Sequence, residues 1–280
     1  KGGELIGGNG LIEMGTFVAI LVGQIGGALL VEGGHHATVG VLVAVALLGW
    51  LASAFMPVAP ATAPQLQLSA NVWRDTWQLM RSVRRYPEVG AAIMGISWFW
   101  LLGAVYTTQL PTFTRLHLGG NAEVYSVILA LFSIGIAVGS VLCAKLSRGR
   151  LELGLVLLGG AGMTVFGIDL YLAAHEPWTG ELLLLSQVLH SPRHWRPMAD
   201  LFLLGLAGGF FTVPLYTWLQ TAAPEEFRSQ AIAANNIVNG LYMVAAAAAS
   251  ALILALTDSL ALLFLLTALA NVPALGRLCW

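Results

Sequence analysis

The chain has 280 residues, of which 58% are hydrophobic and only 10% charged, and its formal net charge is −1. Soluble domains carry about 25% charged residues, so this composition excludes an ordinary water-soluble protein and indicates a surface that faces lipid. A nearly neutral chain also lacks the basic surface on which nucleic-acid binding depends.

Eight apolar stretches are long enough to cross a membrane, which takes about 20 residues. In chain order they cover residues 10–31, 38–57, 88–109, 123–146, 152–174, 198–219, 229–255 and 258–278. Lipid offers the backbone no hydrogen-bond partners, so each stretch must satisfy its own polar groups and is predicted to be a helix. The alternating strands of about ten residues that build a membrane barrel do not occur. The sequence therefore predicts an all-α membrane protein.

The basic residues predict how the helices are oriented. If residue 1 is cytoplasmic, ten of the 13 Lys and Arg residues lie on the cytoplasmic side, and only Arg115, Arg193 and Arg196 lie outside. The positive-inside rule selects this orientation over its inverse. Because eight spans return the chain to its starting side, both termini are predicted to be cytoplasmic.

Two connections are longer than the others. Residues 58–87 begin with a Pro/Ala run, after which Trp73, Trp77 and Met80 recur at helical spacing with arginines on another face. This pattern predicts an amphipathic helix at the cytoplasmic headgroup layer. The outer connection, 175–197, contains an apolar run that is too short to span and is expected at the membrane interface. The first connection divides the chain into two spans before it and six after it.

Small residues at three- and four-residue spacing let membrane helices approach closely, and such seams also slide in transporters. A basic Gly-Arg turn follows the fourth span. The residues assigned to helix packing or gating are Gly23, Gly26, Gly27, Gly139, Arg148, Gly149, Arg150, Gly208 and Gly209. Simple close packing explains the glycines equally well, and positive-inside anchoring explains the arginines.

Polar side chains inside membrane spans are costly and therefore mark functional positions. The predicted substrate cavity consists of Tyr106, Thr107, Thr108, Gln109, Asn235, Asn236 and Asn239. Hydrogen bonding between helices is the alternative role for the asparagines. Glu13 and Asp169 are possible sites of proton coupling, although Asp169 also fits a plain interfacial position near the outer surface.

No enzymatic site is predicted within this chain. No nucleophile, base and orienting group converge in the sequence, and the six histidines lack the spacing of zinc ligands. A phosphate-binding glycine loop followed by Lys-Ser/Thr is absent, so nothing points to ATP-driven transport. Cys143 and Cys279 are expected to be buried apolar residues. We therefore expect no catalytic residue, no metal and no cofactor.

Several segments together resemble the lysophospholipid transporter family of the major facilitator superfamily. The resemblance is carried by residues 4–13, 97–100, 118–121, 129–136, 166–170, 208–215, 220–221 and 228–236. It is strongest to the version fused to an acyltransferase and an acyl-ACP synthetase. Residues 139–150 are similar to the superfamily's cytoplasmic loop motif, but Ala144 and Lys145 stand where the family has an acidic residue.

The resemblance implies twelve spans in two six-helix halves, of which this chain holds spans five to twelve. Residues 1–57 are then the last two helices of the N-terminal half, 58–87 the linker between the halves, and 88–280 the C-terminal half. The implied function is flipping of lysophospholipid, chiefly lysophosphatidylethanolamine, across the bacterial inner membrane, followed by re-acylation by a cytoplasmic or fused acyltransferase. An exporter of hydrophobic drugs or metabolites on the same fold is the alternative, and a membrane anchor without transport is a third possibility.

Overall fold

The computed structural model describes residues 2–32, 34–57, 71–173 and 176–278. Within these ranges the chain is built from helices, and the one β-bridge is an isolated pair, Gly120 with Leu183. The helices are α1 Gly2–Glu32, α2 His35–Ala54, α3 Val72–Val83, α4 Pro87–Leu116, α5 Ala122–Leu146, α6 Gly154–Ala173, α7 Leu185–His190, α8 Pro192–Ala222, the 3₁₀ turn η1 Glu225–Phe227, α9 Arg228–Thr257 and α10 Leu260–Leu278.

Eight of these helices are long and apolar enough to cross a membrane, which confirms the predicted all-α membrane fold. Three of them extend well beyond the predicted stretches. Helix α1 begins at Gly2 instead of residue 10. Helix α4 continues through Pro111 to Leu116, and α8 begins at Pro192 instead of residue 198. Proline suits the first turn of a helix, where its missing N–H has no partner to lose. Arg193 and Arg196 therefore lie in the first two turns of α8 and not in a loop.

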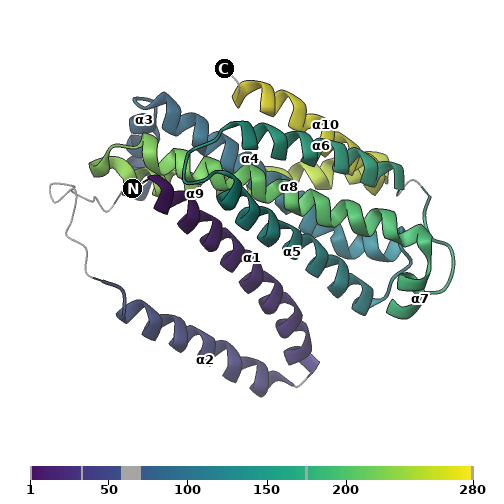
Figure 1. The fold of residues 1–280 in the computed structure, drawn as a ribbon. Coiled ribbons are helices and arrows are strands. Elements are labelled where there is room, and N and C mark those ends of the chain that lie inside the picture. Colours follow the sequence, from purple (N-terminus) through teal and green to yellow (C-terminus); the bar gives the residue numbers. More distant parts are fainter. Residues whose placement is uncertain (1, 33, 58–70, 174–175, 279–280) are drawn as a thin grey trace.

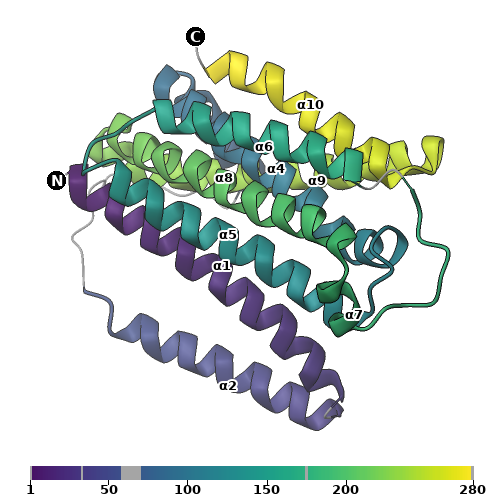
Figure 2. The same cartoon turned by 45° about the vertical axis from the view of Figure 1, so that its right-hand side comes forward.

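Helices α4, α5, α6, α8, α9 and α10 form one bundle, and α1 lies along α5 and α8 (Figures 1 and 2). Helix α2 lies apart from the bundle, beside α1, and none of its residues is buried. The part of the molecule that surrounds a buried interior is thus α1 together with the six long helices α4, α5, α6, α8, α9 and α10.

Basic side chains gather at one end of the bundle. This basic end holds the N-terminus, α3, the turn between α5 and α6, the start of α9 and the C-terminal part of α10 (Figure 1). Its described basic residues are Arg74, Arg81, Arg84, Arg85, Lys145, Arg148, Arg150, Arg228 and Arg277. Arg115, Arg193 and Arg196 lie at the opposite end, near α7. The two groups are separated as the positive-inside argument requires, while the membrane side that each end faces stays a prediction.

The amphipathic helix predicted within 58–87 is present as α3. It begins after Asn71, whose side-chain oxygen accepts a hydrogen bond from the backbone N–H of Arg74 at 3.0 Å, a typical N-cap. Trp73 and Trp77 are 87% and 69% exposed. Two exposed tryptophans on one helix suit the headgroup layer of a membrane, and that location stays a prediction. Residues 58–70 lie outside the described ranges, as does Cys279, whereas Cys143 is buried.

Glycines bring α5 and α8 into backbone contact. A Cβ atom added to Gly209 would meet the backbone of Ser140 and Ile136, and one added to Gly139 would meet the backbone of Leu206. A Cβ on Gly208 would instead meet the Phe99 ring. Small residues allow this approach because no side chain separates the two helices.

The three glycines of α1 that were predicted to pack against another helix have open surroundings. Cβ atoms on Gly23, Gly26 and Gly27 would meet nothing within 4 Å in the described chain, so packing through them stays a prediction. Arg148 and Gly149 form the tight turn after α5, with φ values of 47° and 76°.

The long connection before α8 is fastened to the turn between α4 and α5. Leu183 donates its backbone N–H to Gly119 at 2.7 Å, and the Trp178 ring covers Gly119, whose φ of 63° favours glycine. The backbone N–H of Trp178 donates to the Leu116 carbonyl. The apolar run is therefore held against this end of the bundle and does not span, as predicted. Burial lowers the pKa of the neighbouring His117, so this imidazole is neutral near pH 7.

Candidate functional site

A polar pocket of about 210 Å³ lies where α1 meets α4, α8 and α9. It joins residues that are up to 227 positions apart, from Asn9 to Asn236. Its walls are formed by Asn9, Ile12, Glu13, Thr16, Trp100, Tyr216, Leu219, Gln220, Ile232, Asn235 and Asn236. We call this space the central pocket.

Helical spacing places the α1 residues on the pocket. Asn9, Glu13 and Thr16 follow at i, i+4 and i+7, so they share one face of α1. The opposite face carries Leu11, which is 62% exposed. The pocket is therefore lined by the polar stripe of an otherwise apolar helix, a pattern that membrane helices show where they border a functional path.

A pair of amides closes one end of the central pocket. The Gln220 side-chain nitrogen donates to the Asn9 side-chain oxygen at 3.0 Å, and the Asn9 nitrogen donates to the Thr217 hydroxyl at 3.0 Å. Arg228 donates from Nε to the Gln220 carbonyl at 2.9 Å, which ties the start of α9 to the end of α8. These bonds fix the amides, since a buried amide without a partner is costly.

Aromatic side chains also line the central pocket. The Trp100 indole N–H donates to the Tyr216 hydroxyl at 3.0 Å, and the Trp100 ring stacks on Phe17 with 6.3 Å between centroids. Behind this wall, the Ser97 hydroxyl donates to Asn239 at 2.7 Å. The pocket is thus lined by both amides and aromatic rings.

Glu13 is the single carboxylate among the residues that line the central pocket, and none of those residues is basic. Its side chain is 5% exposed, and Oε2 has no hydrogen-bond partner in the described part of the chain. The Oδ1 atom of Asn235, also in the pocket wall, is likewise without a partner there. Burying an unpaired carboxylate costs free energy, so the site offers two acceptor oxygens to a ligand that brings N–H donors or a positive charge.

The structure brings together part of the predicted site. Glu13, Asn235 and Asn236 line the central pocket, and Asn239 lies one turn behind Asn235, bonded to Ser97. Their roles in substrate binding or coupling stay predictions.

Residues 106–109 lie elsewhere. Tyr106 is buried against Gly167 and Phe264, and the ring centroids of Tyr106 and Phe264 are 5.1 Å apart. Thr107 and Thr108 donate to carbonyl oxygens of their own helix, at 2.7 Å each, and Gln109 is half-buried. None of the four lines the central pocket. Tyr106 lies six positions after Trp100, which places it about 9 Å further along α4 and on a different face of the helix.

Sequence reasoning missed Tyr216 and Gln220 in α8, and assigned no site role to Asn9. The signal for Asn9 was present, because it lies four residues before Glu13 on the same helical face. The α8 residues sit near the end of a long apolar helix, where a polar residue is expected for purely interfacial reasons, so their sequence positions carried no comparable signal.

At the α7 end, Asp169 forms an ion pair with Arg196. Arg196 donates from Nε to Oδ2 at 3.0 Å and from Nη2 to Oδ1 at 2.5 Å, a two-bond arrangement. Asp200 is buried, and its Oδ2 atom has no hydrogen-bond partner within the described ranges. It lies beside Asp169 and was not predicted. A carboxylate held this way is already neutralised, so the ion pair gives no support to Asp169 as a proton carrier, and that role stays a prediction.

We expect Arg196→Lys to lower the melting temperature of the protein in detergent. Lysine keeps the charge but cannot make both bonds to Asp169, which leaves two neighbouring carboxylates less well compensated. Arg115→Lys, at an exposed position at the same end, is the matched control and should melt like the parent. Equal melting of all three proteins would show that the two-bond geometry contributes nothing.

Comparison with known proteins gives a consistent family assignment. The sequence pattern described as Major Facilitator Superfamily matches residues 1–247. A lysophospholipid transporter LplT from Enterobacter sp. (strain 638) is 28% identical over 231 residues, which are 78% of this chain and 51% of that protein. A lysophospholipid transporter LplT from Yersinia enterocolitica is 27% identical over 229 residues, 79% of this chain and 50% of its own length. This chain thus spans about half the length of these relatives. No solved structure matches it.

Proposed function

Because this chain belongs to the major facilitator superfamily, we propose that it transports lysophospholipid, chiefly lysophosphatidylethanolamine, across the bacterial inner membrane. Two relatives named as lysophospholipid transporters support the substrate class. The observation that carries the proposal is the buried Glu13 carboxylate in the central pocket, among neutral amides. Its Oε2 atom has no hydrogen-bond partner among the described residues.

The headgroup of lysophosphatidylethanolamine matches what the pocket lacks. Its ammonium has three N–H donors and one positive charge, and the pocket presents the free acceptor atoms of Glu13 and Asn235. Its phosphate needs donors, which the side-chain amide of Asn236 supplies from the same wall. Trp100 contributes a ring face that attracts cations.

The acyl chain needs an apolar exit from the pocket. Ile12 and Ile232 line the pocket and are 64% and 40% exposed, so its rim is apolar and open. A single acyl chain can leave between these side chains toward lipid while the headgroup stays among the amides. This arrangement suits a lipid with one acyl chain, because the polar headgroup contacts the amides and the apolar chain contacts the rim and the surrounding lipid.

The proposal includes the arrangement of the whole protein. Residues 1–57 are the last two helices of the first half, 58–87 the linker, and 88–280 the second half, with the basic end and both termini in the cytoplasm. The lysophospholipid moves from the outer to the inner leaflet, where a cytoplasmic or fused acyltransferase re-acylates it. Downhill movement drawn by re-acylation requires no coupled proton, and Glu13 and Asp169 remain the two predicted sites for coupling.

Reconstituted vesicles test the proposal. We expect the whole protein to move fluorescent lysophosphatidylethanolamine inward, so that albumin outside no longer extracts it, at a rate well above that of protein-free vesicles. A flat hydrophobic cation such as ethidium serves as the competing substrate, since the Trp100 and Phe17 rings also suit a drug exporter. Transport of ethidium without movement of the lysolipid would replace this proposal with the exporter.

A further inference from the structure

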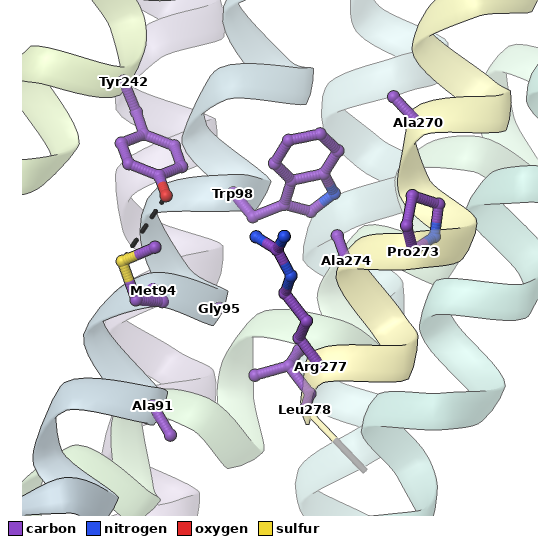
Figure 3. Close-up of a pocket in the computed structure, with 10 residues that line it drawn as sticks. All are labelled: Ala91, Met94, Gly95, Trp98, Tyr242, Ala270, Pro273, Ala274, Arg277 and Leu278. Atoms are coloured by element: carbon purple, nitrogen blue, oxygen red, sulfur yellow. Dashed lines mark hydrogen bonds between the residues drawn. The ribbon is translucent and has the colours of Figure 1, made fainter. Parts of the chain in front are cut away.

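A second and larger pocket, of about 430 Å³, lies between α4, α9 and α10 (Figure 3). We call it the lateral pocket. Its walls are almost entirely apolar, and its only charged residue is Arg277. The residues that line it are Ala91, Met94, Gly95, Trp98, Tyr242, Ala270, Pro273, Ala274, Arg277 and Leu278.

The lateral pocket is separate from the central pocket. Trp98 faces the lateral pocket and Trp100 faces the central one. Each residue turns the helix by about 100°, so the side chains of Trp98 and Trp100, two positions apart, point about 200° apart. The two pockets are therefore on opposite faces of α4. No residue lines both. The function proposed for the central pocket therefore does not account for the lateral one.

Hydrogen bonds hold the walls of the lateral pocket in place. The Trp98 indole N–H donates to the Asn271 side-chain oxygen at 2.8 Å, and the Asn271 nitrogen donates to the Gly160 carbonyl at 2.8 Å. On the other wall, the Tyr242 hydroxyl donates to the Met94 sulfur at 3.4 Å (Figure 3). The cavity is thus built between side chains of α4, α9 and α10, and Asn271 ties its α10 wall to the backbone of α6.

The pocket opens because α9 and α10 diverge. They meet at Asp258, which has a left-handed φ of 48°, and α10 then packs mainly against α6 and little against α9. Figures 1 and 2 show α10 lying over α6. The slot left between α9 and α10 has α4 as its floor and faces the outside of the bundle, where a membrane protein meets lipid chains.

Arg277 supplies the charge at this pocket. It lies in the last turn of α10, at the basic end, and its guanidinium is directed into the pocket near Trp98 and Tyr242 (Figure 3). No ion pair of Arg277 occurs within the described residues. Guanidinium binds phosphate oxygens with two parallel bonds, and the apolar slot beside it suits a hydrocarbon chain. A site with both features has the chemistry of a phospholipid.

We propose that the lateral pocket binds one membrane glycerophospholipid from the leaflet at the basic end. Its phosphate pairs with Arg277, the Tyr242 hydroxyl and Trp98 ring border the headgroup, and one acyl chain fills the slot between α9 and α10. The bound lipid replaces the helix–helix packing that α9 and α10 lack. It is a resident lipid, distinct from any molecule that passes through the central pocket.

Native mass spectrometry of the whole protein tests this site. The delipidated protein is titrated with dioleoylphosphatidylglycerol in detergent, and bound lipid is counted. We expect one tight lipid in the parent, about tenfold weaker binding in Arg277→Gln, partial rescue in Arg277→Lys, and loss of binding in Ala274→Trp, which fills the slot. Arg150→Gln removes an exposed charge at the same end and should bind as the parent does.

One competitor and one further variant identify the occupant. Excess inorganic phosphate should leave the lipid bound, because phosphate has no chain for the slot, and Glu13→Gln should bind lipid normally, because Glu13 lines the other pocket. Equal weakening by Arg277→Gln and Arg150→Gln would overturn the site in favour of general attraction to the basic end. Loss of the tight lipid in Glu13→Gln would overturn it too. Because the readout is binding, the result does not depend on the transport proposal.

Discussion

Glu13→Gln is expected to slow lysophosphatidylethanolamine transport about 10- to 100-fold. Hydrogen bonds to charged groups contribute about 1.5–3 kcal/mol, and each 1.4 kcal/mol corresponds to a factor of ten. Glutamine has nearly the same shape and fits the same wall, so the change removes the charge and leaves the central pocket in place. Initial rates in vesicles containing the whole protein measure the effect.

The headgroup dependence of this effect is the decisive observation. Lysophosphatidylglycerol has no ammonium, so its transport should change far less in Glu13→Gln. Glu123→Gln is the control, since Glu123 is exposed in the first turn of α5 and carries the same charge. An equal loss for both lysolipids would show that Glu13 does not pair with the ammonium. Unchanged rates for both would remove Glu13 from the binding site.

Gly209→Ala is expected to destabilise the bundle by about 1–3 kcal/mol, the usual range for overpacking a close contact. The new methyl group would overlap the backbone of Ser140 and Ile136 in α5. Backbone atoms cannot rotate aside as a side chain does, so α5 and α8 must separate. For a domain of this size, that corresponds to a fall in melting temperature of roughly 2–12 °C.

A matched glycine isolates the contribution of the contact. Gly240 is also in the interior of a helix, α9, and a Cβ there meets nothing within 4 Å. Alanine is the better helix former by up to about 1 kcal/mol, so Gly240→Ala should melt at the parent's temperature or slightly above. If Gly209→Ala melted no lower than Gly240→Ala, the close backbone contact between α5 and α8 would not contribute to the stability of the bundle.

Part of the site could be predicted from polarity alone. A carboxylate or asparagine in an apolar helix is rare enough to be noticed one residue at a time, and so Asn235 and Asn236 were predicted to line a cavity and Glu13 to be a coupling site. All three line the central pocket, and their roles stay predictions. The same reasoning grouped Tyr106 with them, because polarity does not report the direction in which a side chain points. In the folded chain Tyr106 packs against Phe264, on a different face of α4 from Trp100.

The sequence by itself determined the number of membrane-spanning helices, their approximate position and their polarity, because hydrocarbon thickness and backbone hydrogen bonding act on each segment alone. Only the tertiary structure decided which faces meet. The central pocket needs Asn9 of α1 beside Gln220 of α8, and the lateral pocket needs α10 to leave α9 and pack on α6. Such pairings depend on glycine seams and side-chain shapes from segments far apart in the chain, so no local pattern specifies them.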